Sequence, residues 1–237
     1  MRENIKALKA AFPHTIPVFT GFTFLGIAYG ILMNSKGYGV GWTVLMSLMA
    51  FAGSAQYVAI TFLTTVFNPV YALLLTIMVN ARHLFYGIAM LDKYKDAGKV
   101  KPYLIFGLCD ETFSIVCSTE PPEGVSRSSF YFFITLLDHS YWVLGSAIGG
   151  LLGSMVSFNT KGLSFVLTAL FVVIFVGQWK SQQDHKPAVI GVVCSVLCLA
   201  IFGSSNFIIP AMLAILAVLT IYHKGYVKDK KLIEEKA

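Results

Sequence analysis

Long runs of apolar residues, separated by short polar breaks, constrain this chain more than any other feature. Eight such runs cover residues 15–34, 41–67, 69–91, 102–119, 130–156, 163–179, 187–203 and 207–222. A helix of about 20 apolar residues spans the hydrocarbon core of a bilayer. The runs therefore predict an all-α, polytopic integral membrane protein with about seven or eight transmembrane helices.

The composition supports a chain that is dissolved in a lipid bilayer. Hydrophobic residues make up 56% of it and charged residues 13%, whereas a soluble domain carries about 25% charged residues. The net charge of +6 is spread over the polar breaks and the two ends, so nucleic acid is not an expected partner. We expect one transmembrane domain over residues 1–237, with possible repeat halves at about 12–91 and 102–180 and then a helical hairpin at 187–222.

The basic residues predict an orientation. Arg2, Lys6 and Lys9 precede the first run, and five lysines follow the last one, so both termini are expected in the cytoplasm. Three simple crossings would place the lysine-rich loop 92–101 on the opposite side. A broken or re-entrant segment near residues 52–56 would resolve this conflict, and run 130–156 is then expected to be irregular too.

Small residues recur at helical spacing in two of the runs and indicate close helix packing. Gly26 and Gly30 form one small-xxx-small pair, and Gly145, Gly149 and Gly153 continue the pattern in a second run. Glycines at this spacing let two helix backbones approach closely within a membrane. We expect them to form helix–helix contacts with no chemistry of their own.

Several polar residues lie where hydrocarbon is expected, and they carry most of the functional signal. At about 1.5 Å of rise per residue, six of them fall near the middle of their runs, and two more lie at a shallower depth. An isolated charge at such a depth costs from a few to more than ten kcal/mol, so these groups should face one another or a water-filled cavity. The deep ones are Gln56, Asn80, Arg82, His83, Asp110 and Glu111, and the shallower ones are Asp138 and His139.

The charge balance among these groups predicts proton chemistry. Arg82 is one positive charge, against three carboxyl groups. Burial and like-charge repulsion both favour the neutral acid, so at least one carboxyl should keep its proton near neutral pH. The alternative is a static ion pair between Arg82 and one acid. The predicted proton-coupling or intramembrane charge network comprises Arg82, Asp110, Glu111, Asp138 and His139.

The run from Ala52 to Gln56 has small and polar residues where leucine would be expected. If the helix breaks there, the free N–H groups of its second half could hold a carboxylate. A packing notch is the alternative. The predicted substrate-binding residues are Gly53, Ser54, Gln56, Asn80 and His83.

Enzyme signatures are missing from the sequence. It has no His-Glu-x-x-His zinc pair, no Gly-x-Ser-x-Gly elbow and no phosphate-binding loop. We therefore expect no enzymatic activity, no cofactor and no metal site. Ser54 with His83 or His139 would supply the residue types of a hydrolase, but no other feature of the sequence supports this alternative.

Four motifs, taken in order, resemble those of the AzlC/YgaZ family, and the resemblance runs from about Phe12 to Tyr222. The family usually has aspartate at the position of Ser164, and this departure weakens any role for that residue. The motifs are Phe51–Tyr57, Asn80–Gly87, Asp110–Phe113 and Gly162–Phe171, the last followed by Gln178-Trp179.

The resemblance implies the large subunit of an exporter of branched-chain amino acids in the bacterial inner membrane. It also implies a partner, a small hydrophobic membrane subunit of the AzlD/YgaH type. The expected substrates are leucine, isoleucine and valine, with methionine as a further candidate, and the expected energy source is a proton gradient. The competing prediction is a non-transporting membrane subunit or an assembly scaffold.

Overall fold

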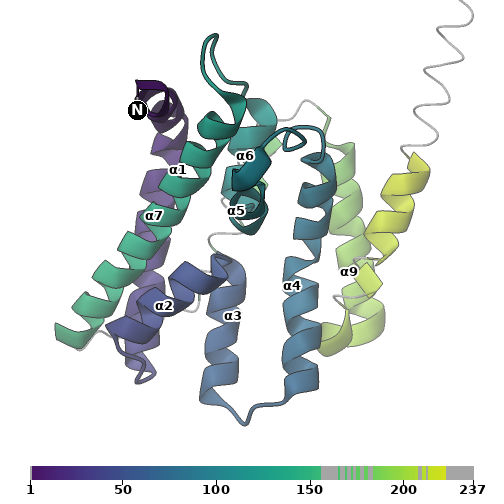
Figure 1. Cartoon of the computed structure of the whole chain (residues 1–237). Helices are drawn as coiled ribbons and strands as arrows, with labels where there is room; N and C mark the ends of the chain where they lie inside the picture. The colour runs from purple at the N-terminus through teal and green to yellow at the C-terminus, as the bar shows by residue number, and fades with distance from the viewer. Residues whose placement is uncertain are drawn as a thin grey trace, which may run out of the picture. The chain divides into compact units, whose positions relative to one another are not determined.

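The computed structural model describes residues 2–155, separate positions between 165 and 180, and the ranges 184–207, 210–211 and 213–222. The chain divides into two compact units, residues 1–168 and 169–237. Within the described residues every regular element is a helix (Figure 1), which confirms the predicted all-α class. Ser164, Gln178 and the lysines after Tyr222, used above as evidence, lie outside the described residues.

Two long helices and several short ones make up the first unit. The short 3-10 helix η1 runs from Gly98 to Val100. The α-helices of this unit are α1 (Arg2–Ser35), α2 (Val40–Ala50), α3 (Gly53–Thr64), α4 (Pro69–Ala89), α5 (Lys101–Phe106), α6 (Asp110–Ser118) and α7 (Arg127–Met155).

Two helices of the described residues are long and apolar enough to cross a membrane, Glu3–Ser35 and Lys186–Gly203. A third is possible by the same measure if the two halves of α4, bent by 45° between Ile77 and Arg82, form one span. These helices agree with a membrane protein. Seven or eight crossings stay a prediction, because the runs 41–67 and 102–119 each contain two short helices.

The contact between α1 and α7 is the most extensive in the unit, and glycines line it. A Cβ atom on Gly30 would overlap the backbone of Ser146 and Gly149. A Cβ atom on Gly149 would overlap the backbone of Ile27. Only glycine allows the two backbones to lie this close, which confirms the predicted close packing of small residues.

The run 41–67 is broken where the sequence predicted it. Helix α2 ends at Ala50 and α3 begins at Gly53. The Tyr38 hydroxyl, just before α2, donates a hydrogen bond of 2.7 Å to the carbonyl of Leu63, near the end of α3. The chain therefore returns to the end from which it started, so α2 and α3 form a re-entrant hairpin.

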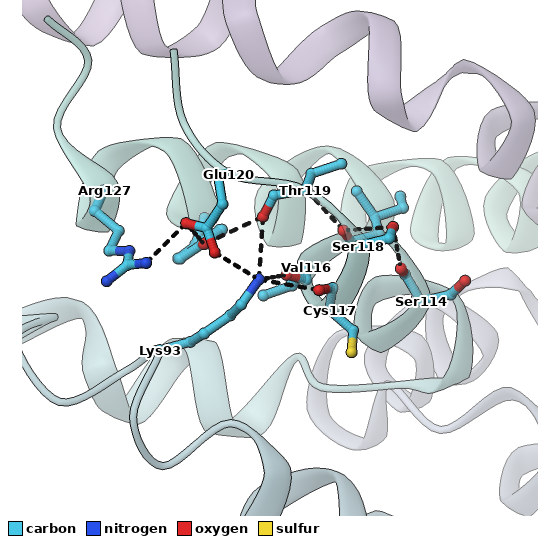
Figure 2. Close-up of polar contacts among 10 residues, drawn as sticks. Lys93, Ser114, Val116, Cys117, Ser118, Thr119, Glu120 and Arg127 are labelled. Carbon is cyan, nitrogen blue, oxygen red and sulfur yellow. Dashed lines mark hydrogen bonds and ion pairs between the residues drawn. The ribbon is translucent and has the colours of Figure 1, made fainter. Parts of the chain in front are cut away.

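The run 102–119 is broken in the same way, which the sequence analysis missed. Helix α5 ends at Phe106 and α6 begins at Asp110. Lys93, in the loop before α5, donates hydrogen bonds to three carbonyl oxygens at the end of α6, and Figure 2 shows these bonds. Thus α5 and α6 form a second re-entrant hairpin. The three carbonyls belong to Val116, Cys117 and Thr119.

The two hairpins begin at opposite ends of α1. Tyr38 follows the last residue of α1, Ser35. At the other end, Ala97 of the lysine-rich loop shares a core cluster with Ala11, and it lines the same small pocket as Asn4. The loop 92–101 therefore lies at the N-terminal end of α1, as the predicted break near residues 52–56 requires.

The prediction that run 130–156 is irregular is wrong. Helix α7 continues from Arg127 to Met155 without a break. The second broken run is 102–119, because Gly107 ends α5 after only six residues. After this second hairpin, α7 begins at the end where the lysine-rich loop lies.

Glu120, in the loop after α6, connects the lysine-rich loop to the start of α7. It forms ion pairs with Lys93 at 3.0 Å and with Arg127 at 2.7 Å (Figure 2). The hydrogen bond from Arg127 and then the one from Lys93 hold the pKa of Glu120 at about 2, well below its ordinary value. Because the pKa is lowered, the pairing is present above a pH of about 4.5 and is lost as the pH falls through about 2.

Replacing Lys93 by methionine is expected to loosen the end of α6. The ammonium group compensates the partial negative charge at a helix C-terminus, an effect of about 0.3–1 kcal/mol. Hydrogen–deuterium exchange of the amides from residue 115 to 123 should become faster in Lys93→Met. Lys95→Met, which changes an exposed lysine of the same loop, should leave the exchange as it is. Equal exchange in Lys93→Met and the unchanged protein would contradict the capping role.

In the second unit, the longest described helix is α9 (Lys186–Asn206), which is apolar and largely exposed within the unit. Gly203 has a left-handed φ of 71° and bends it near its end. The shorter apolar helix Leu213–Tyr222 follows. Before α9, the ring of Trp179 stacks on His185 with 4.2 Å between ring centroids.

Candidate functional site

The centre of the first unit contains an ion pair made by residues from different helices. The Nη2 atom of Arg82, on α4, lies 2.8 Å from Oδ2 of Asp110, on α6. The same nitrogen donates a hydrogen bond of 2.9 Å to Oγ of Ser54, on α3. The Tyr86 hydroxyl donates to the other carboxylate oxygen of Asp110 at 2.7 Å. We call Ser54, Arg82, Tyr86 and Asp110 the clasp.

The clasp lies at the tips of both re-entrant hairpins. Ser54 is the second residue of α3, and Asp110 is the first residue of α6. No side chain caps either helix at these N-termini. The N-terminus of a helix is partly positive, so the carboxylate of Asp110 is favourably placed there and other N–H groups stay free to bind an anion.

Arg82 contacts both hairpins, through Ser54 of α3 and Asp110 of α6, and it lies just after the bend of α4. Its side chain is 31% exposed and that of Asp110 is 15% exposed. The pair is therefore partly exposed, unlike a fully buried structural pair. A guanidinium and a carboxylate held at this distance are complementary to a zwitterion.

Gln56, which was predicted to bind substrate, is buried in the core, and its substrate role stays a prediction. It is 1% exposed, and its Oε1 accepts a hydrogen bond of 2.7 Å from the indole of Trp142, on α7. Its Nε2 donates to Oγ of Ser47, which in turn donates to Ser146. These bonds attach the first hairpin to α7 and engage both the oxygen and the nitrogen of the Gln56 amide.

Gly53 lies against the same tryptophan. A Cβ atom on Gly53 would come within 3.1 Å of Cη2 of Trp142. This contact favours the packing-notch alternative for Gly53 itself. A substrate role for Gly53 stays a prediction.

Asn80 and His83 flank Arg82 on α4. The Oδ1 atom of Asn80 is buried and has no hydrogen-bond partner among the described residues. The ring of His83 packs edge-on against Tyr86 with 5.6 Å between ring centroids. Asn80 therefore has an unused buried acceptor two residues before Arg82, whereas His83 packs against one of the clasp's side chains.

The remaining residues of the predicted charge network are not joined to the clasp by ion pairs among the described residues. Glu111 is half-buried in the first turn of α6. Asp138 is fully buried on α7 and accepts a hydrogen bond from Thr112. His139 bridges two helices, with Nδ1 3.0 Å from the Tyr103 hydroxyl and Nε2 3.3 Å from the Ser47 carbonyl.

The hydrolase alternative finds no support in this geometry. Ser54 is hydrogen-bonded to Arg82, and no hydrogen bond joins it to a histidine in the described part of the chain. His139 has both ring nitrogens engaged elsewhere. A nucleophilic serine needs an adjacent base within hydrogen-bond reach.

Sequence reasoning missed Tyr86, Thr112 and Trp142. Tyr86 is one helical turn after Arg82 and so lies on the same face of α4. Thr112 follows two acids that were recognised, and its hydroxyl is the partner of Asp138. A buried tryptophan N–H needs an acceptor, so Trp142 could have been paired with a buried amide such as Gln56.

The sequence of this chain matches a known protein family. The family described as "AzlC protein" matches residues 17–156, which include the clasp. The chain belongs to the AzlC family. A relative from Bacillus subtilis (strain 168), named "Branched-chain amino acid transport protein AzlC", is 58% identical over 218 residues, which cover 92% of this chain and 86% of that protein.

Other AzlC relatives are similar over most of their length. An uncharacterized membrane protein of Helicobacter pylori (strain ATCC 700392 / 26695) is 42% identical over 94% of this chain and 98% of its own. "Inner membrane protein YgaZ" of Escherichia coli (strain K12) is 26% identical over 86% of this chain and 82% of its own. No solved structure matches the chain. These similarities support a membrane protein with a transport role.

Proposed function

We propose that this AzlC-family protein is the large subunit of a proton-coupled exporter of branched-chain amino acids. The observation that carries the proposal is the 2.8 Å pair of Arg82 and Asp110 at the tips of two hairpins that begin at opposite ends of α1. The name of the relative from Bacillus subtilis, a branched-chain amino acid transport protein, supports the substrate class. The substrates are leucine, isoleucine and valine, with methionine as a further candidate.

The clasp has the chemistry that an amino acid needs. The guanidinium of Arg82 and the uncapped N-terminus of α3 bind the substrate carboxylate. The carboxylate of Asp110 and the free Oδ1 atom of Asn80 bind the substrate ammonium. The substrate thus separates Arg82 from Asp110. Arg82 exchanges the carboxylate of Asp110 for that of the substrate, and Asp110 exchanges the guanidinium for the substrate ammonium.

Two opposed re-entrant hairpins suit alternating access. In many transporters the binding site lies between inverted repeats, at the ends of discontinuous helices. In the proposed mechanism, α1 with its following hairpin and α4 with its following hairpin act as two such repeats. Movement of one hairpin would open the clasp to one side, and movement of the other hairpin would open it to the opposite side.

The proposal places the protein in the bacterial inner membrane with both termini in the cytoplasm. The lysine-rich loop 92–101 and the basic start of α1 are at the same end of the unit, which supports this orientation by the positive-inside rule. A small hydrophobic subunit of the AzlD/YgaH type is the proposed partner. The chain carries no nucleotide-binding loop, so a proton gradient supplies the energy.

Counter-flow in liposomes tests the transport function. Purified protein, alone and with the small subunit, is reconstituted into liposomes that contain unlabelled leucine, and radiolabelled leucine, isoleucine, valine, methionine or lysine is added outside. We expect the branched-chain amino acids to accumulate and lysine to stay outside. A scaffold would move no leucine even with the small subunit present, and this result would refute the proposal.

A further inference from the structure

Asp138 is the most deeply buried carboxyl group of the described residues, and it has no countercharge there. Its side chain is 0% exposed. Oδ2 accepts a hydrogen bond of 2.8 Å from the Thr112 hydroxyl, while Oδ1 has no partner among the residues that the structure describes. No lysine or arginine of the described residues forms an ion pair with it. An ionised carboxylate in this position would be left almost without compensation.

The titratable groups that face Asp138 from the second hairpin carry no positive charge. Glu111 and Cys109 approach it from the start of α6, and Tyr103 approaches it from α5. Glu111 would repel a negative charge on Asp138, and the other two groups are neutral near pH 7. This side of Asp138 therefore favours the neutral acid.

The other elements that pack on α7 do not supply a cation either. Neutral His139 satisfies the hydrogen bonds at both of its ring nitrogens. Nε2–H donates to the Ser47 carbonyl, and Nδ1 accepts from the Tyr103 hydroxyl. Helix α2 contains no titratable side chain. On α1, His14 packs against Phe130, two turns before Asp138 on α7.

A proton on Asp138 completes the local hydrogen bonds. The protonated carboxyl can donate through Oδ2 to Thr112, and the Thr112 hydroxyl can then donate to the thiol of Cys109, 3.2 Å away. One carbonyl oxygen is left over, and an unpaired carbonyl oxygen is far less costly than an unpaired charge. We propose that Asp138 is the site of the coupled proton, held while the second hairpin packs on α7 and released when that hairpin moves away.

One short helix connects this proton site to the clasp. Asp110 and Thr112 are two residues apart in the first turn of α6. A substrate that separates Arg82 from Asp110 moves the start of α6, and with it the hydroxyl that holds Asp138. The protonated site and the substrate-loaded clasp are therefore alternatives, as an exporter that exchanges a substrate for a proton requires. This inference rests on the proposed function.

Leucine binding in detergent, measured with the small subunit present from pH 5.5 to 8.5, tests the assignment. If one proton competes with one leucine, the dissociation constant should rise by about tenfold for each unit of decreasing pH on the acidic side. Asp138→Asn should bind leucine with no pH dependence and should lose uphill transport. The matched control, Glu123→Gln, changes an exposed acid of the loop after α6 and should keep the full pH dependence.

Thr112→Val provides a second test that does not change the carboxyl group. Among the described residues, Thr112 is the one side chain that hydrogen-bonds to Asp138. Its bond to an ionised carboxylate is charge-assisted and stronger than its bond to the neutral acid, so Thr112→Val destabilises the carboxylate more and the midpoint of the pH dependence should move to higher pH. An unchanged pH dependence in Asp138→Asn, or an unchanged midpoint in Thr112→Val, would refute the assignment while leaving the transport proposal intact. Absence of leucine binding by the unchanged protein would refute both.

Discussion

Arg82→Ala is expected to lose leucine binding and to lower the stability of the protein. A charge-assisted hydrogen bond to a carboxylate contributes about 1.5–3 kcal/mol, so affinity should fall by about 10- to 150-fold. Removing the guanidinium also leaves Asp110 without its cation, which for this partly accessible pair should cost about 2–4 kcal/mol of unfolding free energy. Leucine affinity and the unfolding temperature in detergent measure the two effects.

Two further variants separate binding from stability. Arg82→Ala combined with Asp110→Asn removes the unpaired charge, so stability should recover while leucine binding stays lost. Arg82→Lys keeps the charge but loses the planar fork that binds a carboxylate through two nitrogens, so it should fold and bind leucine weakly. A stable Arg82→Ala protein with the affinity of the unchanged protein would show that the pair has neither role.

Gly149→Leu is expected to prevent α1 and α7 from packing together. Its Cβ atom would overlap the backbone of Ile27, and a backbone cannot move aside as a flexible side chain can. The two helices must separate along the whole glycine-lined contact, which should cost about 3 kcal/mol or more. The unfolding temperature in detergent should fall sharply, and elution as a single species from a sizing column should be lost.

Gly21→Leu is the matched control for this prediction. Gly21 lies on α1, and nothing comes within 4 Å of a Cβ atom placed there. Leucine also favours a helix over glycine by roughly 1 kcal/mol, so the variant should be as stable as the unchanged protein or slightly more stable. Equal stability of Gly149→Leu and Gly21→Leu would contradict the glycine-mediated contact.

Features that depend on local sequence were predictable. The run 15–34 is too apolar to be exposed to water. The small and polar residues from Ala52 to Gln56 favour a continuous helix less than leucines would. Their effects act within one or two helical turns, through hydration and helix propensity. The all-α class, the break before Gly53 and the close contact of the glycine-containing helices were therefore all visible in the sequence.

The second broken segment shows where this reasoning stops. Run 102–119 is short and contains Gly107 and several hydroxyl residues besides its two acids, but none of these by itself distinguishes a broken segment from a simple span. Its hairpin form is stabilised by Lys93, which lies outside the run and binds the carbonyls at the end of α6. In contrast, α7 contains Asp138 and His139 and still continues as one helix, because α2, α5 and α6 supply partners for both residues.

The sequence by itself determined that Arg82 needs an acid and that the buried acids outnumber it. Only the tertiary structure decided that Asp110 is the partner of Arg82, that Gln56 accepts a hydrogen bond from Trp142, 86 residues away, and that Asp138 is buried with no ion-pair partner in the described part of the chain. The physical reason is that the cost of burying a polar group is a property of the residue, whereas its compensation comes from groups distant in the chain. Composition reveals the cost, and only the packing of helices reveals which group compensates it.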